Sequence, residues 1–351
     1  MSARRQSSGL SGSHYTDPAH FQREQDSVFT RGWIALCRED EVADAGAFFA
    51  TELHGEPVVV VRDEQGAVRV LSNVCRHRGM LLTTGTGVAP RLRCPYHAWT
   101  YKLDGRLAGA PLMPGMKNTS TCDLPQYKTW CWGGFVFANP NARAKPPALK
   151  RLDDSIGNYG MADFHLIEAF EEVWPCNWKC LVENFMDAYH LSVVHPETLR
   201  PLTPSHLSRE GVHGKHFTSY TAHYAKSAPA RKHFAPGLSN AERNQSRLFC
   251  IYPSMVASVS ADTLAFLMLQ PETVDSVRVR WGLSSYESKL AVRERRARIR
   301  KWQDINAEDH AVLAQLQRGL RSHHYTPGPL APPDLEGCIA HFHTWYQSSV
   351  K

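Results

Sequence analysis

Two groups of residues in this chain have the types and the spacing of metal ligands. In the first group, Cys75 precedes His77, and Cys94 precedes His97 after an interval of sixteen residues. Two thiolates can bind one iron of a [2Fe–2S] cluster while two imidazoles bind the other iron. A structural zinc also accepts two cysteines and two histidines, but zinc fingers usually pair like with like. Because each segment here supplies one residue of each type, we favour the iron–sulfur cluster over zinc.

The second group contains His190, His195 and a carboxylate from elsewhere in the chain. Two imidazoles and one carboxylate can hold a mononuclear Fe(II) that keeps positions open for oxygen. Asp187 lies one helical turn before His190, close enough to hydrogen-bond that histidine. A cluster that delivers electrons beside an iron that activates oxygen indicates an oxygenase.

The elements around the first group are short strands. Residues 57–62, 67–71 and 133–138 are rich in β-branched and aromatic side chains, and residues 63–66 have the composition of a turn. We therefore expect a small all-β domain around this group. Residues 85–90 half-resemble a dinucleotide fingerprint but lack its third glycine, so we interpret them as a turn.

The second group depends on a helix predicted over residues 178–189. On a straight helix, His190 and His195 would point about 140° apart. Pro196 favours an extended backbone at His195, so we expect the helix to end or deform between the two histidines. Strands are predicted at 248–260, 264–270 and 276–284, and helices over 288–320 and 334–347, the last with Asp334 as its N-cap.

The composition indicates a folded protein with a sizeable core. The chain has 351 residues, of which 42% are hydrophobic, and no apolar run of membrane-spanning length. Nine cysteines at irregular spacing, without a secretion signal, argue against a disulfide framework. The net charge of +6 is concentrated between Arg293 and Lys301, but no nucleic-acid recognition motif accompanies it. We therefore expect a cytoplasmic protein that binds neither nucleic acid nor a membrane.

Several segments of the chain resemble those of a known family. Residues 76–79 and 94–99 resemble the two cluster-binding loops of Rieske proteins. Residues 174–179, 183–190 and 194–196 are similar to the iron-binding segment of Rieske non-haem iron oxygenase α subunits. The similarity extends over most of the chain and is closest to the branch of choline monooxygenase and the glycine-betaine and carnitine oxygenases. One departure is Ala98, which stands where the family usually has glycine.

The resemblance implies a set of ligands for each metal group. The cluster ligands would be Cys75, His77, Cys94 and His97, and the ligands of the mononuclear iron would be His190, His195 and Asp309. Asp309 is inferred from its place in a Glu-Asp pair ahead of residues 316–320. Glu308 and Asp304 are the competing carboxylates.

Two further residues of the iron-binding segment would take part in turnover. Asp187 would connect His190 to His97 of the partner subunit, so that electrons cross a subunit boundary. A simple supporting role for the Asp187 carboxylate is the alternative. Asn184, in the same segment, is a further catalytic candidate.

The fold that the resemblance implies is α+β. A helical segment at residues 1–37 would pack with the catalytic domain, followed by an all-β Rieske [2Fe–2S] domain at residues 38–145. Residues 146–351 would form the catalytic domain, a helix-grip arrangement of an antiparallel sheet with helices around the mononuclear iron. The assembly would be a homotrimer.

The expected activity is the O₂-dependent hydroxylation of a small organic substrate, and oxidative N-demethylation of a methylated or quaternary amine is one form of it. An aromatic-ring cis-dihydroxylating α subunit and a Rieske electron carrier without oxygenase activity are the alternatives. Because no nucleotide motif is present, electrons from NAD(P)H would arrive only through a separate ferredoxin or flavin reductase. Five aromatic residues could form a cage for an ammonium group: Tyr220, Tyr224, Tyr252, Phe266 and Trp281. They could equally belong to the core.

Overall fold

The computed structural model describes residues 8–116, 119–229 and 233–350, and the chain divides into two compact units. One unit, called the β unit below, is Thr30–Pro146. The other, called the α+β unit, combines Met1–Phe29 with Pro147–Lys351. Residues 1–7 of the predicted N-terminal helical segment lie outside the described residues. An all-β unit together with a mixed unit confirms the predicted α+β class.

The β unit contains two antiparallel sheets. The larger has the strand order β1-β10-β9-β4-β3-β2-β5, and the smaller has the order β6-β7-β8. The three strands predicted from the sequence are confirmed as β3, β4 and β10. The bounds of the strands are β1 Ile34–Arg38, β2 Ala47–Leu53, β3 Glu56–Arg62, β4 Val68–Ser72, β5 Thr86–Val88, β6 Leu92–Arg93, β7 Thr100–Tyr101, β8 Leu107–Gly109, β9 Gln126–Trp132 and β10 Phe135–Asn139. Two 3-10 turns, η2 Glu39–Val42 and η3 Thr119–Cys122, complete the unit.

The glycine-rich segment before residue 90 is part of the larger sheet. Gly87 lies in β5 opposite Phe48 of β2. A Cβ atom added at Gly87 would meet the Phe48 ring at 2.7 Å. Glycine is therefore required at this position for close packing, and the segment needs no nucleotide to explain it.

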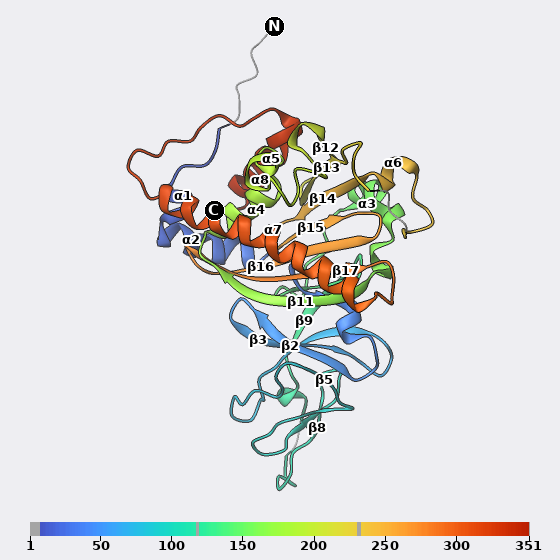
Figure 1. The fold of residues 1–351 in the computed structure, drawn as a ribbon. Coiled ribbons are helices and arrows are strands. Elements are labelled where there is room, and N and C mark those ends of the chain that lie inside the picture. Colours follow the sequence, from blue (N-terminus) through green and yellow to red (C-terminus); the bar gives the residue numbers. More distant parts are fainter. Residues whose placement is uncertain (1–7, 117–118, 230–232, 351) are drawn as a thin grey trace. The chain divides into compact units, whose positions relative to one another are not determined.

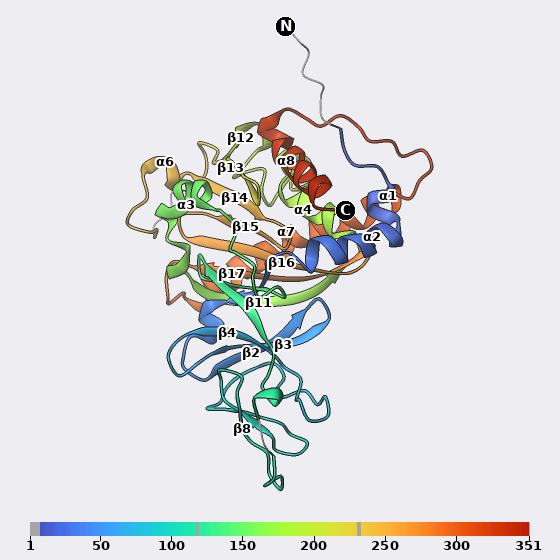
Figure 2. The same ribbon diagram turned by 180° about the vertical axis from the view of Figure 1, so that it is seen from behind.

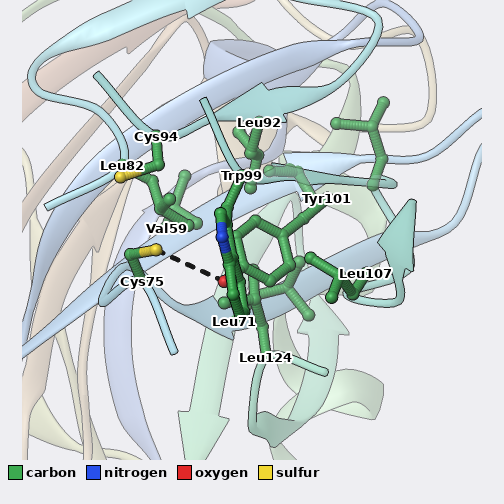
Figure 3. Close-up of a cluster of buried hydrophobic side chains, with 12 residues drawn as sticks. Val59, Leu71, Cys75, Leu82, Leu92, Cys94, Trp99, Tyr101, Leu107 and Leu124 are labelled. Atoms are coloured by element: carbon green, nitrogen blue, oxygen red, sulfur yellow. Dashed lines mark hydrogen bonds between the residues drawn. The ribbon is translucent and has the colours of Figure 1, made fainter. Parts of the chain in front are cut away.

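The core of the β unit includes the two cysteines of the first ligand group (Figure 3). Figure 3 shows the sulfur atoms of Cys75 and Cys94 at one edge of a cluster of buried side chains that also contains Trp99 and Tyr101. The aliphatic members come from both sheets and from the loops between them: Val59, Val61, Leu71, Leu82, Leu92, Leu103, Leu107 and Leu124. Burial of this apolar surface fixes the backbone on which the two thiols are carried.

The α+β unit is organised around one seven-stranded antiparallel sheet, in the order β11-β17-β16-β15-β14-β13-β12. The single strand predicted at 248–260 is wrong, because Pro253 interrupts it and the chain reverses between Ile251 and Met255. The bounds of the strands are β11 His165–Trp174, β12 Ser208–Glu210, β13 Phe217–His223, β14 Gln245–Ile251, β15 Met255–Val259, β16 Thr263–Thr273 and β17 Ser276–Ser285.

Helix α7 is the longest helix described, and it runs across the sheet of the α+β unit (Figures 1 and 2). It packs against α4, α5 and β11, whereas α8 packs against β12 and β13. The bounds of the helices are α1 Ser13–Thr16, α2 Pro18–Glu24, α3 Lys150–Ile156, α4 Trp178–Phe185, α5 Leu191–Val194, α6 Asn240–Arg243, α7 Val292–Gly319 and α8 Pro333–Ser349. Single turns of other helix types are η1 Gln25–Phe29, η4 Gly157–Tyr159, η5 Met161–Asp163 and η6 Ser205–Leu207.

The predicted N-cap of the last helix is wrong by two residues. Pro332 occupies the N-cap position of α8, and Asp334 lies within its first turn. The Asp334 carboxylate accepts a hydrogen bond from the Glu210 backbone nitrogen at 3.0 Å and so joins α8 to β12. The Asp334 side chain therefore forms a tertiary hydrogen bond with β12 instead of capping the helix, as the sequence had suggested.

A buried ion pair connects α2 to α4, the helix that leads into the second ligand group. Lys179 Nζ lies 2.5 Å from Glu24 Oε1, and both side chains are 0% exposed. The Trp178 indole and the Tyr346 hydroxyl also donate to Glu24, at 2.8 and 2.5 Å. Burial lowers the pKa of Lys179, and the charge of Glu24 opposes this shift. The network connects α2, α4 and α8 at a fixed separation.

Two further findings concern the chain as a whole. Within the described ranges, no helix is both long and apolar enough to cross a membrane. The nine cysteines all lie in those ranges, and none of them forms a disulfide there.

Candidate functional site

The two cysteine–histidine segments of the β unit adopt the same turn. In both loops the cysteine backbone nitrogen donates to the carbonyl five residues later, at 2.8 Å. Four residues after each cysteine, the amides of Gly79 and Ala98 donate to the carbonyls of Cys75 and Cys94, at 3.0 Å. Gly79 and Ala98 both have positive φ, 76° and 60°. Alanine adopts this conformation less readily than glycine, so the Ala98 loop retains the shape of its counterpart at some cost in strain.

The four side chains of these loops divide into a buried pair and an exposed pair. Cys75 and Cys94 are each 2% exposed, whereas His77 and His97 are exposed. The two imidazole rings lie with their centroids 4.7 Å apart, and Trp99 stacks on His77 at 4.9 Å. The imidazole side of the site is therefore accessible to an electron donor or acceptor from outside the β unit.

The spacing of the four donor atoms favours a cluster over a single zinc ion. Ligand atoms of a four-coordinate zinc lie within about 4 Å of one another, as follows from its bond lengths. Across the described side chains, no three of these four residues bring their donor atoms within 4.8 Å. In a [2Fe–2S] cluster with mixed ligands, the thiolates and the imidazoles bind different irons and lie further apart. The residues fit the cluster and do not fit the zinc alternative.

A tyrosine hydroxyl from β7 contacts one of the two thiols. Tyr101 Oη lies 3.4 Å from Cys75 Sγ and accepts a hydrogen bond from the Arg76 backbone nitrogen at 3.0 Å. Burial, reinforced by the neighbouring Cys75, raises the pKa of Tyr101. The hydroxyl therefore keeps its proton and can donate it to the sulfur, a hydrogen bond that tunes the potential of a cluster.

In the α+β unit, the structure brings His190, His195 and Asp309 together. The Nε2 atoms of the two histidines are 3.3 Å apart. Asp309 Oδ1, from α7, lies 3.1 Å from His195 Nε2 and 3.7 Å from His190 Nε2. The three donor atoms all lie within 4.8 Å of one another, which is the separation that one metal ion requires.

The backbone reaches this arrangement by a break that begins earlier than the sequence suggested. The predicted helix 178–189 ends at Phe185, and residues 186–190 form turns. The short helix α5 then separates His190 from His195, whose φ of −116° and ψ of 56° are not helical. His190 is thus outside α4, and the two imidazoles converge because the helix is interrupted before the first of them.

The environment of Asp309 fits a cation at the point where the three side chains meet. Asp309 Oδ1 is buried and accepts no hydrogen bond from the described residues. A buried carboxylate oxygen without a hydrogen bond destabilises the folded chain unless a positive charge neutralises it. Two imidazole nitrogens and this oxygen form the donor set of a mononuclear Fe(II) site with open positions.

Two more carboxylates orient the histidines from the opposite side. Asp187 Oδ2 lies 3.3 Å from His190 Nδ1, and Glu308 Oε2 lies 2.7 Å from His195 Nδ1. In each ring, Nδ1 therefore faces a carboxylate while Nε2 faces the shared position. The hydrogen bond to Glu308 fixes the tautomer of His195, whereas Asp187 contacts His190 as a neighbouring charge without a hydrogen bond within the described residues. Glu308, a competing ligand in the sequence, has this supporting position instead.

The third competing carboxylate lies on another face of α7. Asp304 accepts a hydrogen bond from Arg300 Nε at 3.0 Å, one helical turn away, and its side chain is half exposed. Of the three carboxylates considered, the structure places only Asp309 with the two histidines.

Opposing effects act on the protonation of His195. Burial lowers the pKa of this imidazole, but the neighbouring carboxylates of Asp309 and Glu308 outweigh burial, so the pKa is raised overall. A positive charge is thus favoured at the position that Nε2 faces, whether a proton or a metal ion supplies it.

A small pocket of about 50 Å³ adjoins the three ligands. Asn184, the further catalytic candidate, lines this pocket from the last turn of α4. Tyr220, Trp302 and Asn306 line it as well. Asp187 does not line it. It is partly exposed, and its other oxygen accepts a hydrogen bond from the Tyr189 backbone nitrogen at 2.5 Å.

A larger cavity of about 380 Å³ adjoins the pocket, and the two share six lining residues. Side chains two positions apart on β13, β14 and β15 form one wall, because alternate residues of a strand face the same side. A row across that wall is Tyr220, Leu248 and Ser258, which are cross-strand neighbours. Residues three and four apart on α7 form the opposite wall: Glu294, Ala297, Arg298, Lys301, Trp302 and Ile305.

The end of the cavity at the start of α7 is charged. Arg298 donates to Asp262 at 3.1 Å and to Glu294 at 2.8 Å. Arg298 precedes Asp309 by eleven residues, which is about 16 Å along a helix axis. The cavity therefore has an apolar and aromatic part near the ligand triad and a charged end at the start of α7.

Of the five aromatic residues that could form a cage or belong to the core, two line the cavity and three do not. Tyr220 and Tyr224 line the cavity. Tyr252 stacks on Trp345, and Trp281 stacks on Phe170. Neither Tyr252 nor Trp281 lines the cavity. Phe266 is buried in β16, also outside it.

Sequence reasoning missed Trp302, which contributes an aromatic face to both the pocket and the cavity. Its spacing of seven residues from Asp309 places it on the same side of α7, and this spacing was the available signal.

A second group of potential ligands does not have the geometry of a metal site. Glu210, His213 and His341 have ligand atoms within 4.8 Å. However, the rings of His213 and His341 stack at 3.6 Å with an angle of 21° between their planes. Nitrogen lone pairs lie in the ring plane, so stacked imidazoles direct them along nearly parallel lines rather than towards one ion.

Comparison with protein families gives two matches that together span most of the chain. The ring hydroxylating alpha subunit (catalytic domain) matches residues 161–351. The Rieske [2Fe–2S] domain matches residues 32–128. The first match covers the mononuclear ligands, and the second covers both cysteine–histidine loops.

Curated relatives align over nearly the whole chain. The carnitine monooxygenase oxygenase subunit of Escherichia coli (strain K12) is 28% identical over 94% of this chain and 90% of its own length. The glycine betaine monooxygenase oxygenase subunit of Chromohalobacter salexigens is 27% identical over 96% of this chain and 84% of its own length.

Solved structures share the fold. The quaternary ammonium Rieske monooxygenase CntA in complex with L-carnitine aligns with a TM-score of 0.84 and 22% identity, over 99% of this chain and 96% of its own. Naphthalene 1,2-dioxygenase from Rhodococcus sp. aligns with a TM-score of 0.77 and 18% identity, over 97% and 94%. At these identities the likeness establishes the architecture of both units.

Proposed function

This chain belongs to the family of ring-hydroxylating α subunits, and on that premise we propose that its substrate is a small N-methylated or quaternary amine. The protein is a Rieske-type oxygenase, an oxidoreductase that uses O₂, a [2Fe–2S] cluster and a mononuclear iron. When bound, these groups supply stored electrons and an iron with positions open to oxygen.

The aromatic faces near the ligand triad carry this proposal. Tyr220 and Trp302 line both the iron pocket and the cavity, and Tyr224 lines the cavity further on. An ammonium group is attracted to the face of an aromatic ring, and the attraction increases when water is excluded. The charged side chains that line the same cavity balance, because Asp262 and Glu294 face Arg298 and Lys301. The aromatic faces therefore supply the attraction for an ammonium group.

The proposed reaction balances as follows. The N-methyl compound, O₂, two electrons and two protons give the N-hydroxymethyl compound and water. The C–N bond of that product then breaks, which releases formaldehyde, the demethylated amine and, from a quaternary amine, one proton. The side chains lining the cavity hold the methyl carbon near the ligand triad and exclude water from it.

Electron delivery is proposed to involve other proteins and other subunits. His77 and His97 are exposed on the β unit, and Asp187 is partly exposed on the α+β unit. These exposures support a homotrimer in which electrons pass from His97 of the partner subunit through Asp187 to His190. A separate ferredoxin or flavin reductase would supply electrons from NAD(P)H, because the sequence contains no nucleotide motif. Nine free thiols support a location in the reducing cytoplasm.

Reductase-supported turnover with a panel of substrates tests the proposal. The panel contains L-carnitine, glycine betaine, choline and naphthalene, supplied with ¹⁸O₂. We expect formaldehyde and a demethylated amine from at least one quaternary amine, with uptake of one labelled oxygen atom. A cis-diol from naphthalene with no turnover of the amines would overturn the proposal in favour of arene dihydroxylation.

Metal analysis separates the oxygenase from a simple electron carrier. The ligand sets predict three irons per chain, two in the cluster and one at the His190 site. His190→Ala is expected to retain two irons and the cluster spectrum while losing turnover. Two irons per chain in the unaltered protein would indicate a carrier.

A further inference from the structure

The hydroxyl of Tyr220 is a buried donor without a protein partner. Tyr220 is 2% exposed and lies on β13, where its side chain lines both the iron pocket and the larger cavity. Its oxygen forms no hydrogen bond with any residue in the described ranges. A buried hydroxyl that lacks a partner destabilises the folded state, so its presence needs a reason.

A second unpaired donor lines the same pocket from the opposite wall. Asn306 of α7 is 6% exposed, and its Nδ2 likewise makes no hydrogen bond within the described part of the chain. Asn306 precedes Asp309 by three residues, which places both side chains on one side of the helix. The pocket beside the iron ligands therefore has one hydroxyl donor from the sheet and one amide donor from α7.

These donors contrast with the other polar groups of the cavity. The Tyr224 hydroxyl is paired with Ser246 Oγ at 2.9 Å, and Arg298 is paired with Asp262 and Glu294. Unpaired donors thus occur next to the reacting position, where a bound molecule would be closest. Burial, followed by the charges of Cys338, Asp187 and Asp309, raises the pKa of Tyr220, so its hydroxyl retains the proton it would donate.

We infer that Tyr220 Oη and Asn306 Nδ2 donate hydrogen bonds to an oxygen atom of the substrate. This inference rests on the proposed function and narrows its substrate class to amines that carry a hydroxyl, carbonyl or carboxylate oxygen a few bonds from the methylated nitrogen. A site whose buried donors need an acceptor rejects analogues that lack one, because binding would leave the donors unpaired. Tyr220 is then a specificity-determining residue, since its ring contacts the ammonium group and its hydroxyl reads the oxygen.

Two probes of equal charge and nearly equal shape test the inference. Choline carries a hydroxyl where propyltrimethylammonium carries a methyl group. Their dissociation constants are measured by calorimetry on the anaerobic, iron-loaded protein. We expect the unaltered protein to bind choline about 30-fold more tightly than the alkyl probe, which corresponds to two hydrogen bonds. Tyr220→Phe should lower this preference to about 5-fold, because it retains the ring and removes only one of the two donors.

Tyr224→Phe is the matched control, because it removes the other cavity hydroxyl, which already has a partner. This variant should keep the preference for choline. The inference is overturned if Tyr220→Phe retains the full preference, or if both variants weaken it equally.

Thermal unfolding without ligand gives a readout that does not depend on the probes. Tyr220→Phe should raise the midpoint by about 2–4 °C, because it removes an unpaired buried hydroxyl, whereas Tyr224→Phe should lower it. A lower midpoint for Tyr220→Phe would mean that the hydroxyl has a protein partner, and would overturn the inference. If neither probe binds the unaltered protein, the quaternary-amine proposal fails, and the unfolding comparison still decides whether Tyr220 is an unpaired donor.

Discussion

Oδ2 of Asp187 lies 3.3 Å from Nδ1 of His190, while Nε2 of the same ring faces Asp309. One imidazole therefore connects a partly exposed carboxylate to the position where a metal ion would bind. Because residues 186–190 form turns rather than helix, this contact does not depend on helical spacing. It depends on the break after α4.

Replacing Asp187 by asparagine should separate iron binding from electron delivery. The asparagine side chain keeps the size of Asp187 and an oxygen that can face Nδ1 of His190, so both iron centres should be retained. The charge is lost, and reductase-coupled turnover should fall by about 100-fold, the upper range for groups that support a metal ligand. Iron content and the steady-state rate are the measurements. Asp154→Asn, which alters an exposed ion pair on α3, should change neither. Unchanged turnover in the Asp187 variant would refute the electron path.

Mixed assemblies should show whether electrons cross between subunits. Cys75→Ser is expected to lack the cluster but keep the mononuclear iron, and His190→Ala is expected to do the reverse. Each variant alone should be inactive. If electrons pass to the neighbouring subunit, trimers assembled from both chains should regain part of the activity, because one chain's cluster can serve the other chain's iron. Denaturation-free subunit exchange or co-expression with two affinity tags would supply the mixture, and an inactive mixed trimer would indicate transfer within one chain.

The Glu308 carboxylate should strengthen iron binding through His195. Glu308→Gln keeps the shape and a hydrogen-bond acceptor but removes the charge that faces Nδ1 at 2.7 Å. The affinity for Fe(II) should fall by about 10-fold, as measured by competition with a chelator. Asp304→Asn, four residues earlier on α7, removes a carboxylate that binds Arg300 instead and should leave the affinity unchanged. Equal effects of the two variants would contradict the role assigned to Glu308.

Ala98 should be a site where glycine stabilises the protein. Its φ of 60° costs alanine about 1–2 kcal/mol, and the greater freedom of glycine in the unfolded chain offsets about half of the gain. Ala98→Gly should therefore increase the free energy of unfolding of the β unit by about 0.5–1 kcal/mol. Loss of the cluster absorbance on heating reports the change, and the absorption spectrum itself should not shift.

Ala138→Gly provides the opposite control for that measurement. Ala138 is buried in strand β10, where glycine loses packing and gains freedom when unfolded. The temperature at which the Ala138→Gly variant loses half of its cluster absorbance should therefore fall. A fall for Ala98→Gly as well would show that positive φ is not the limiting feature of the loop.

The buried pair of Lys179 and Glu24 should be sensitive to removal of one partner. Lys179→Met leaves the Glu24 carboxylate buried without its cation and should cost about 3–5 kcal/mol in the free energy of unfolding. The double variant Lys179→Met with Glu24→Gln removes the stranded charge and should recover much of that loss. Urea unfolding of the α+β unit measures both. A single variant as stable as the double one would mean that water already reaches Glu24.

The metal ligands could be identified from the sequence because few side-chain types bind iron. Cys75, His77, Cys94 and His97 lie within two short loops, so local spacing alone brought each pair together. The family, the α+β class and the oxygenase activity followed from the same segments and are confirmed. The three strands of the β unit were also predictable, since runs of β-branched and aromatic side chains beside a turn segment are local properties.

Spacing along the sequence determined less about the mononuclear site. His190 and His195 were identifiable by type, but a straight helix would have pointed them apart. Only the folded chain shows that the break starts at Met186. Asp309, Glu308 and Asp304 all carry a carboxylate, so residue type alone does not distinguish them as ligands. The rotation of α7 against α4 and α5 decides that Asp309 meets both histidines while Glu308 supports one of them.

The residues that line the cavity could be identified only from the tertiary structure. Five aromatic residues were candidates for the cavity wall, yet only two of them, Tyr220 and Tyr224, line the cavity. A wall built from alternate residues of three strands and one stripe of a helix has no local signature, because its members are brought together by sheet register and helix packing. The sequence by itself therefore determined the metals and the class of reaction. The tertiary structure decided which carboxylate joins the histidines and which side chains meet the substrate.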